Sequence, residues 1–348
     1  MSKMYKVTEP KSNISMAATL IEPLQGLSDL HKIRVSNIYV GIDPDLNLIN
    51  LSGQVIGQLR QLLTEHQLKV IPVLSLEDSA AIKPLAKLLK EKNSFDITLI
   101  SMQPELIKQA RELIPLIRGA VDYSHYDFSA VKNPLFFIVQ QTNRAKAKIA
   151  LLPAHLCSKK EVETLQKRLL TVWSVDYGAC LSSAVAILTT GVNGIISHNT
   201  AQMLQAMSLF EQPSLVRKPL IIGHRGIPSL LPENTLEGVI KAYQLGVDAI
   251  EYDIQLSKDK QIVLMHDHNV QRTTDGVGLI EEMTQAEIKI LRIMNRETIT
   301  DFSVPTLDQL FAQFADTQLI HFIEIKSHKK EIVRRLKTVI DKYHLNDR

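Results

Sequence analysis

The chain has 348 residues, which suffice for one large domain or two modest ones, and its 40 basic and 37 acidic side chains leave a net charge of +3. This near balance of charge gives no indication of a nucleic-acid-binding surface, and no run approaches the roughly 20 apolar residues of a membrane span. Cys157 and Cys180 lack the spacing of a zinc site or a disulfide framework, and residues 1–15 lack the apolar core of a signal peptide. We therefore expect a soluble, cytoplasmic protein.

The first part of the chain predicts a regular alternation of strands and helices. Residues 1–35 form an N-terminal segment with one expected helix at 16–24. From 36 to 210, apolar runs predict strands at 36–42, 69–74, 95–101, 119–123, 148–152, 170–175 and 194–197. Amphipathic stretches predict helices at about 55–66, 104–113, 158–167 and 179–190. This alternation indicates parallel βαβ units, hence an α/β barrel or a doubly wound sheet.

Residues 211–218, with the sequence EQPSLVRK, predict a linker to a second part at 219–348. The second part opens with an apolar run at 220–222, typical of a buried strand, which ends at His224-Arg225-Gly226. Pro232-Glu233-Asn234-Thr235 then opens an amphipathic helix that Gly246 ends, with Asn234 or Thr235 expected as its N-cap.

Three further expected strands of the second part carry charged side chains. Glu251 and Asp253 lie two residues apart on 249–254, so both carboxylates face the same side. The strand at 262–265 ends at His266-Asp267, and the strand at 319–325 carries Glu324, with Lys326 two residues later. Four successive βα units would bring these groups to the carboxyl ends of parallel strands, where βα barrels hold their active sites.

These residue types suit the hydrolysis of a phosphodiester. Glu251, Asp253 and Glu324 offer the oxygen ligands that one divalent cation, Ca²⁺ or Mg²⁺, prefers. Arg225 can hold a non-bridging phosphate oxygen, and Lys326 can add a point charge. His224 and His266 lie on different strands, so one imidazole can act as the base and the other as the acid.

The motifs HRG, PENT, E-x-D, HD and E-I-K, in this order, resemble the first half of a glycerophosphodiester phosphodiesterase. The resemblance implies a TIM-type (β/α)8 barrel that hydrolyses a small glycerophosphodiester to sn-glycerol 3-phosphate and an alcohol. It also implies that the two histidines are the acid–base pair and that the three acids hold the metal ion.

Residues 36–210 resemble the same barrel, from about its third strand to its eighth. Asp43-Pro44-Asp45 falls where the HD pair would stand, and Leu74-Ser75-Leu76 falls where the E-x-K strand would stand. No HRG and no E-x-D precede them. The sequence therefore predicts a degenerate phosphodiesterase-like copy, in which Asp43, Asp45 and Glu77 do no chemistry, followed by a partial catalytic copy.

Two arrangements could complete the second copy, which supplies only the first four strands of a barrel that needs eight. The chain could be the front of a longer tandem protein, or residues 219–348 and 95–200 could close one permuted barrel. The spare strands at 36–42 and 69–74 favour the first arrangement. In the permuted barrel, Trp173 would contact His224 and Glu324.

Two other functions stay open at this point. Because one copy is degenerate and the other incomplete, the chain could be a non-catalytic barrel that binds phosphodiesters or a partner. Alternatively, the substrate could be a lysophospholipid, which would make the activity of the lysophospholipase D type.

Overall fold

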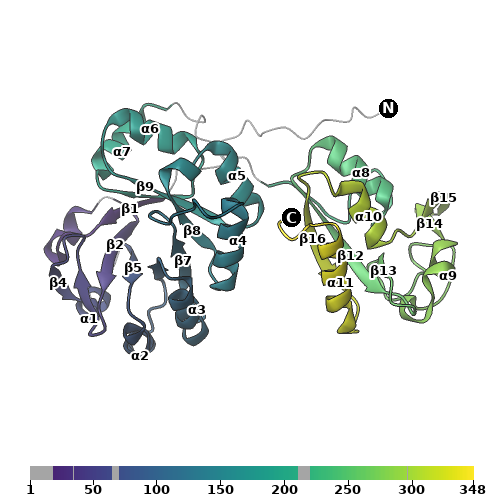
Figure 1. The fold of residues 1–348 in the computed structure, drawn as a ribbon, viewed down its shortest axis with the longest axis horizontal. Coiled ribbons are helices and arrows are strands. Elements are labelled where there is room, and N and C mark those ends of the chain that lie inside the picture. The colour runs from purple at the N-terminus through teal and green to yellow at the C-terminus, as the bar shows by residue number, and fades with distance from the viewer. Residues whose placement is uncertain (1–18, 34, 65–69, 211–219, 296) are drawn as a thin grey trace. The chain divides into compact units, whose positions relative to one another are not determined.

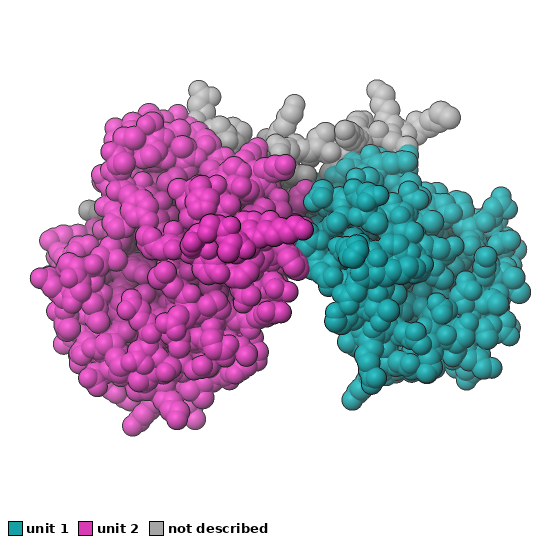
Figure 2. Space-filling view, viewed as in Figure 1, with its two compact units in different colours: residues 1–10, 218–348 teal, residues 11–217 magenta. Residues whose placement is uncertain are grey.

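The computed structural model describes residues 19–33, 35–64, 70–210, 220–295 and 297–348. The described residues fall into two compact units, one within residues 11–217 and the other within residues 218–348 (Figure 2). The expected linker at 211–218 and the first three residues, 16–18, of the expected helix at 16–24 lie outside the described residues. None of the described helices is long and apolar enough to cross a membrane.

The first unit is a closed barrel of eight parallel strands (Figure 1). In order around the ring these are β1 (Thr19–Pro23), β2 (Asn37–Ile42), β5 (Ile71–Leu76), β6 (Thr98–Ser101), β7 (Arg118–Asp122), β8 (Ile149–Leu152), β9 (Thr171–Asp176) and β10 (Gly194–Ser197). The ring closes because β1 pairs in parallel with both β2 and β10. A closed ring leaves no barrel strand with an unpaired edge.

Helices cover the outside of this barrel. They are η1 (Leu27–Lys32), α1 (Leu59–Thr64), η2 (Ser79–Ala81), α2 (Ile82–Lys92), α3 (Pro104–Leu113), α4 (Pro134–Arg144), η3 (Ala154–Leu156), α5 (Lys159–Lys167), α6 (Leu181–Thr189) and α7 (Thr200–Ser208). Strands such as β6, β8 and β10 are buried along their whole length because side chains fill the interior and helices cover the exterior. The interior holds Val73, Ile100, Leu151, Trp173 and Ile196.

The closed ring corrects two expectations. The segment Thr19–Pro23 is the first barrel strand and not part of a helix, because its backbone pairs with strands on both sides. The permuted barrel is also wrong, because residues 19–197 supply all eight strands themselves and place Trp173 inside their own barrel. The expected helix at 55–66 is in fact strand β4 (Val55–Gln58) followed by α1.

The second unit contains a small open sheet. Its elements are β11 (Ile222–Gly223), α8 (Leu236–Leu245), β12 (Ala249–Leu256), β13 (Ile262–Leu264), η4 (Ile280–Glu282), α9 (Gln285–Lys289), β14 (Arg292–Asn295), β15 (Thr298–Ser303), α10 (Leu307–Phe314), β16 (Ile320–Ile325) and α11 (Glu331–Lys342). The central strand, β12, pairs in parallel with β11 and with β16. Among the described strands of this unit, β14 and β15 form a separate antiparallel pair.

The strand at 262–264 differs from the expectation. β13 runs antiparallel to β12, so the two strands form a hairpin and not successive parallel strands. Three of the four expected strands, β11, β12 and β16, are therefore parallel, whereas β13 is not part of a parallel βα unit. The hairpin turn fits its residues because Lys260 adopts a left-handed φ of 66° and its N–H donates to the carbonyl of Ser257.

The barrel unit contains a hairpin of the same kind. β2 pairs in parallel with β1 and β5, and it forms a hairpin with β3 (Asn47–Ile49) through a turn at residues 43–47. In this turn Leu46 has a φ of 60° and its N–H donates to the carbonyl of Asp43. The arrangement of β1, β2, β3 and β5 thus repeats that of β11, β12, β13 and β16, which allows the two units to be aligned on their turns.

His321 of β16 gives the second unit a dependence on pH. Its ring packs against the rings of Phe311, Phe314 and Tyr252, and its Nδ1 lies 3.3 Å from the Tyr252 hydroxyl. Burial lowers the pKa of His321 to about 4, and the positive charge of Arg348 adds to this shift. In the unfolded chain His321 has an ordinary histidine pKa near 6.5. Between pH 6.5 and 4 the unfolded chain therefore binds a proton at His321 that the folded unit does not bind.

We expect the stabilisation that comes from the neutral His321 to be fully present above pH 6.5, and the free energy of unfolding of the second unit to fall by up to about 3 kcal/mol as the pH falls from 6.5 towards 4. Amide hydrogen exchange followed by mass spectrometry at pH 7.5, 6 and 5 measures this loss for each unit separately. His321→Phe should remove the dependence, whereas the exposed His125→Phe should leave it in place. An equal pH dependence in His321→Phe and in the original protein would contradict this assignment.

Candidate active site

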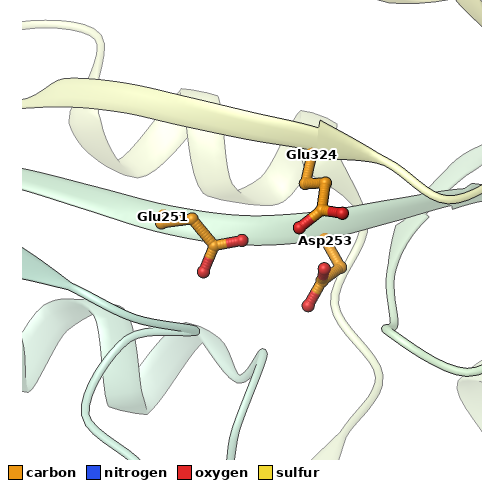
Figure 3. A group of neighbouring side chains, drawn as sticks. All are labelled: Glu251, Asp253 and Glu324. Atoms are coloured by element: carbon orange, nitrogen blue, oxygen red, sulfur yellow. The ribbon is translucent and has the colours of Figure 1, made fainter.

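Three carboxylates converge on one side of the open sheet. Glu251 and Asp253 project from β12 and Glu324 projects from the neighbouring β16 (Figure 3). Asp253 and Glu324 are direct neighbours in the strand register, and one oxygen from each of the three carboxylates lies within 4.8 Å of the other two. Among the described residues, this is the one group of three acidic, histidine or cysteine side chains close enough to hold a metal ion.

The environment of Asp253 fits a cation. Its side chain is 1% exposed, and its Oδ1 atom is buried without a hydrogen-bond partner. A buried carboxylate oxygen without a partner is costly, and a divalent cation with a preference for oxygen ligands would satisfy it. The chemistry and spacing of the three donors therefore suit Ca²⁺ or Mg²⁺.

Two basic side chains border the carboxylates. The Nε atom of Arg225 lies 3.4 Å from Oδ2 of Asp253, and Nζ of Lys326 lies 3.6 Å from Oδ1 of the same residue. Lys326 also donates to Oε1 of Glu324 at 2.5 Å. This hydrogen bond lowers the pKa of Glu324 and raises the pKa of Lys326. Both groups stay charged at neutral pH, so the site offers anionic oxygens for a metal ion and cations for a phosphate.

A strained turn places Arg225 beside the acids. Arg225 has a left-handed φ of 51°, and the next residue, Gly226, has a φ of 89°. The Arg225 N–H donates to Oε2 of Glu251 at 2.9 Å, which links the end of β11 to β12. A left-handed backbone is unfavourable for arginine, and such strain is concentrated at functional sites.

Asn234 is a site residue that the sequence analysis missed, because Asn234 and Thr235 were weighed only as helix caps. Thr235 is the cap of α8, since its hydroxyl accepts from the Gly238 N–H. Asn234 instead donates from Nδ2 to Oδ2 of Asp253 at 2.9 Å and accepts from the Asp253 N–H at 3.1 Å. It is 2% exposed and has a φ of 56°, which asparagine tolerates better than most residues.

We expect Asn234→Ala to weaken metal binding by about 10- to 100-fold, because the Asp253 carboxylate would lose the hydrogen bond from Asn234 Nδ2 that orients it. Titration calorimetry with Ca²⁺ and Mg²⁺ measures this change. Asn93→Ala is the matched control, since Asn93 also has a left-handed φ, 49°, but is exposed and lies in the barrel unit. Unchanged metal affinity in Asn234→Ala would show that Asn234 does not orient the ligand.

The two candidate histidines differ in how firmly they are held. His224 follows β11, its side chain is 70% exposed, and its Nε2 lies 3.9 Å from Oε2 of Glu251. His266 follows β13, its side chain is 30% exposed, and its Nδ1 lies 2.6 Å from Oδ1 of Asp267. The carboxylate of Asp267 keeps the proton of His266 on Nδ1, which leaves Nε2 available for acid–base chemistry. Hydrogen bonds from Arg272 and from His266 lower the pKa of Asp267 to about 2.

The structure thus gathers the seven predicted site residues in the second unit, on or directly after four of its strands, β11, β12, β13 and β16. These are His224, Arg225, Glu251, Asp253, His266, Glu324 and Lys326. After the larger effect of the hydrogen bond from Lys326, the positive charges of Lys326 and Arg225 also lower the pKa of Glu324, so the cations of the site are within electrostatic reach of this carboxylate.

Aligned on the hairpin turns, the barrel unit has different residues at the same places. Asn37 and Tyr39 stand at the positions of Glu251 and Asp253, and they pair with β5 as Glu251 and Asp253 pair with β16. Val73 and Ser75 occupy the positions of Glu324 and Lys326, while Ile21 and Glu22 occupy those of His224 and Arg225.

Asp43 and Asp45 lie in the barrel's hairpin turn and not at the place of the HD pair, which corrects the expected alignment. The side chain of Asp43 accepts hydrogen bonds from the backbone and the side chain of Asn47, both at 2.8 Å. It therefore stabilises the turn, and neither aspartate belongs to the group of three carboxylates.

Comparison with known proteins finds one family and many relatives. Residues 224–346 match the glycerophosphoryl diester phosphodiesterase family. The chain is 42% identical over 112 residues to a glycerophosphodiester phosphodiesterase of Caldanaerobacter subterraneus subsp. tengcongensis, covering 32% of this chain and 46% of that protein. It is 36% identical over 120 residues to glycerophosphodiester phosphodiesterase 1 of Homo sapiens, covering 33% and 36%. The chain thus spans less than half the length of both relatives.

Solved structures give a related result. The structure of an Oleispira antarctica phosphodiesterase in complex with the product sn-glycerol-3-phosphate is 31% identical to this chain, with a TM-score of 0.33. The match covers 36% of this chain and 53% of that one.

Proposed function

Residues 224–346 belong to the glycerophosphoryl diester phosphodiesterase family, and on that premise we propose that this chain hydrolyses glycerophosphodiesters to sn-glycerol 3-phosphate and an alcohol. The observation that carries the proposal is the convergence of three carboxylates with Arg225 and Lys326 in one site. Three carboxylates can bind a metal ion, and two basic side chains beside them can bind the anionic phosphate of a substrate.

Glu251, Asp253 and Glu324 would hold one divalent cation, Ca²⁺ or Mg²⁺. When bound, such a cation polarises a phosphoryl oxygen and offsets the negative charge that builds on it during attack. Asn234 keeps the Asp253 carboxylate in its orientation, so the ligand geometry is fixed before the ion arrives.

The other side chains of the site bind the phosphate or transfer protons. The Arg225 guanidinium holds non-bridging phosphate oxygens, and the Lys326 ammonium adds a second positive charge beside them. One histidine takes a proton from the water whose oxygen bonds to phosphorus. The other histidine gives a proton to the alkoxide oxygen that leaves phosphorus, which completes the alcohol. The first histidine then releases its proton to solvent and the second takes one up, which restores both for the next turnover.

The experiment that tests the function is hydrolysis of glycerophosphocholine by the full chain in water enriched in ¹⁸O. Attack of water on phosphorus should place the label in the phosphate of sn-glycerol 3-phosphate and none in choline. Label in choline, or no hydrolysis with either Ca²⁺ or Mg²⁺ present, would contradict the proposal. A panel that includes lysophosphatidylcholine tests the lysophospholipase D alternative, and binding of glycerophosphocholine without turnover would identify a non-catalytic phosphodiester-binding protein.

We further propose that the barrel unit is a non-catalytic copy of the same fold. The proposal is supported by the apolar and neutral side chains that stand at the aligned positions, such as Tyr39, Val73 and Ser75. At the aligned positions of His224 and Arg225, the barrel unit has Ile21 and Glu22, which supply neither an imidazole nor a guanidinium.

We expect the double variant Asp43→Asn, Asp45→Asn to keep kcat within about threefold of the original, a change of less than about 1 kcal/mol in the barrier. Steady-state hydrolysis of glycerophosphocholine measures kcat, and circular dichroism confirms that the variant is folded. A hundredfold loss of kcat in a folded variant would move the reaction into the barrel unit.

A further inference from the structure

A hydrogen-bonded series of five side chains runs from His266 to Arg225, with these two residues as its ends. Asp267 accepts from His266 Nδ1 at 2.6 Å and from Arg272 Nε at 2.5 Å. Arg272 also donates from Nη1 and Nη2 to the two carboxylate oxygens of Glu233, at 3.0 and 2.7 Å. Glu233 in turn accepts from Nη1 of Arg225 at 3.0 Å. The ends of this series are two of the site residues, Asp267 holds the proton of His266 on Nδ1, and Arg272 and Glu233 have no role so far in the proposed reaction.

Arg272, the middle member of this series, is held by hydrogen bonds to a carboxylate on each side. Its guanidinium donates twice to Glu233 and twice to Asp267, since Nη2 also lies 3.1 Å from Oδ1 of Asp267. Arg272 follows the β12–β13 hairpin, whereas Glu233 precedes α8, so the contacts join two separate segments of the unit. The hydrogen bonds lower the pKa of Glu233 and raise the pKa of Arg272, so both stay charged at neutral pH.

We propose that Arg272 and Glu233 are positioning residues that fix the His266 imidazole relative to the Arg225 guanidinium. The inference rests on the proposed function, because it assigns to the pair the spacing between an acid–base group and a phosphate-binding group. Neither residue touches the phosphate. Each acts through its neighbour, Arg272 through Asp267 on His266 and Glu233 on Arg225.

The spacing matters because the two end groups address different atoms of one phosphate. Arg225 holds non-bridging oxygens, while His266 must reach the oxygen that gains or loses a proton. A misplacement of about 1 Å between such groups can cost on the order of 10²-fold in rate. A planar guanidinium can satisfy two carboxylates at once in a fixed geometry, which the single ammonium group of lysine does not do.

Arg272→Gln, Arg272→Lys and Glu233→Gln test the kinetic part with glycerophosphocholine as the substrate. We expect Arg272→Gln to lower kcat by about 10- to 100-fold with KM within threefold, because the substrate still binds but is held in poor geometry. Arg272→Lys should recover only part of the loss. Arg272→Gln combined with Glu233→Gln should be no worse than the more severe single variant, since the two residues act as one unit.

Arg60→Gln is the matched control, because Arg60 forms an equally forked pair with Glu91 in the barrel unit, at 2.6 and 2.8 Å. Its kcat should not change. A rise in KM at constant kcat in Arg272→Gln would make Arg272 a substrate contact, and full activity in Arg272→Lys would reduce its role to charge alone. Either result would overturn the proposal, as would strictly additive losses in the double variant.

A proton NMR measurement tests the geometry without turnover. The Nδ1 proton of His266, shared with Asp267, should give a resonance downfield of the amide region that His266→Asn removes. We expect this resonance to broaden or vanish in Arg272→Gln and to persist in Arg60→Gln. Its persistence in Arg272→Gln would overturn the proposal. If the original protein hydrolyses nothing but the resonance depends on Arg272, the proposed function fails while the positioning contact stands.

Discussion

Chelation of the divalent cation should abolish hydrolysis of glycerophosphocholine, and addition of Ca²⁺ or Mg²⁺ should restore it. Among the described residues, Glu251, Asp253 and Glu324 form the one group that can hold such an ion. Arg225 and Lys326 alone leave the phosphate without the Lewis acid that offsets the charge of the attacked phosphorus oxygen. The measurement is the rate of sn-glycerol 3-phosphate release after dialysis against EDTA, with and without the metal returned.

Asp253→Asn should lower kcat/KM by about 10³-fold or more, which corresponds to about 4 kcal/mol. The amide is nearly isosteric but neutral, so the metal ligand of the most buried position is lost while the packing is retained. Asp316→Asn is the matched control, since Asp316 is exposed in the same unit and does not belong to the group of three carboxylates. Activity that survives exhaustive chelation, or a near-normal Asp253→Asn variant, would end the metal assignment.

His266→Ala and His224→Ala should each lower kcat by about 10²-fold or more, the usual scale of general acid–base catalysis. The variants should still bind the metal ion, because neither imidazole belongs to the group of three carboxylates. The dependence of kcat on pH tests whether the two histidines are the acid and the base. A protein with one acid and one base gives a bell-shaped profile, and each variant should lose one of its two limbs.

The limb of the pH profile that each variant loses also shows which histidine is the base and which is the acid. The variant that loses the acidic limb lacks the base, and the variant that loses the basic limb lacks the acid. His125→Ala, an exposed substitution in the barrel unit, should keep both limbs. If either site variant kept its full rate and both limbs, that histidine would have no part in the proton transfers.

The sequence was sufficient to predict which side chains meet at the site, because charged residues at the ends of apolar runs are conspicuous. Glu251 and Asp253 share a face because a strand alternates its side chains, and the structure keeps them there with Glu324 as their neighbour in register. Seven of the eight barrel strands were predicted for a similar reason, since buried parallel strands are short and rich in β-branched residues.

The features that the sequence did not predict depend on contacts between distant segments. Thr19–Pro23 is a strand because β2 and β10 flank it, and five residues ending in proline carry no periodicity of their own. The direction of β13 is set by the left-handed turn at Lys260, which no apolar pattern records. Asn234 resembled a helix cap because the partner that it holds, Asp253, lies in another strand.

The register of β12 and β16 also has a consequence for the order in which the protein acquires its structure. In the barrel unit most neighbouring strands follow one another along the chain, so pairing can advance step by step. In the second unit, Asp253 meets Glu324 only after the chain between residues 253 and 324 has folded back, a loop closure that costs about 4 kcal/mol of entropy. Local hairpins such as β12–β13 can form before that event, but the acid cluster cannot. The cation site therefore comes into existence late, and its appearance during refolding marks the moment at which the central sheet of the second unit is complete.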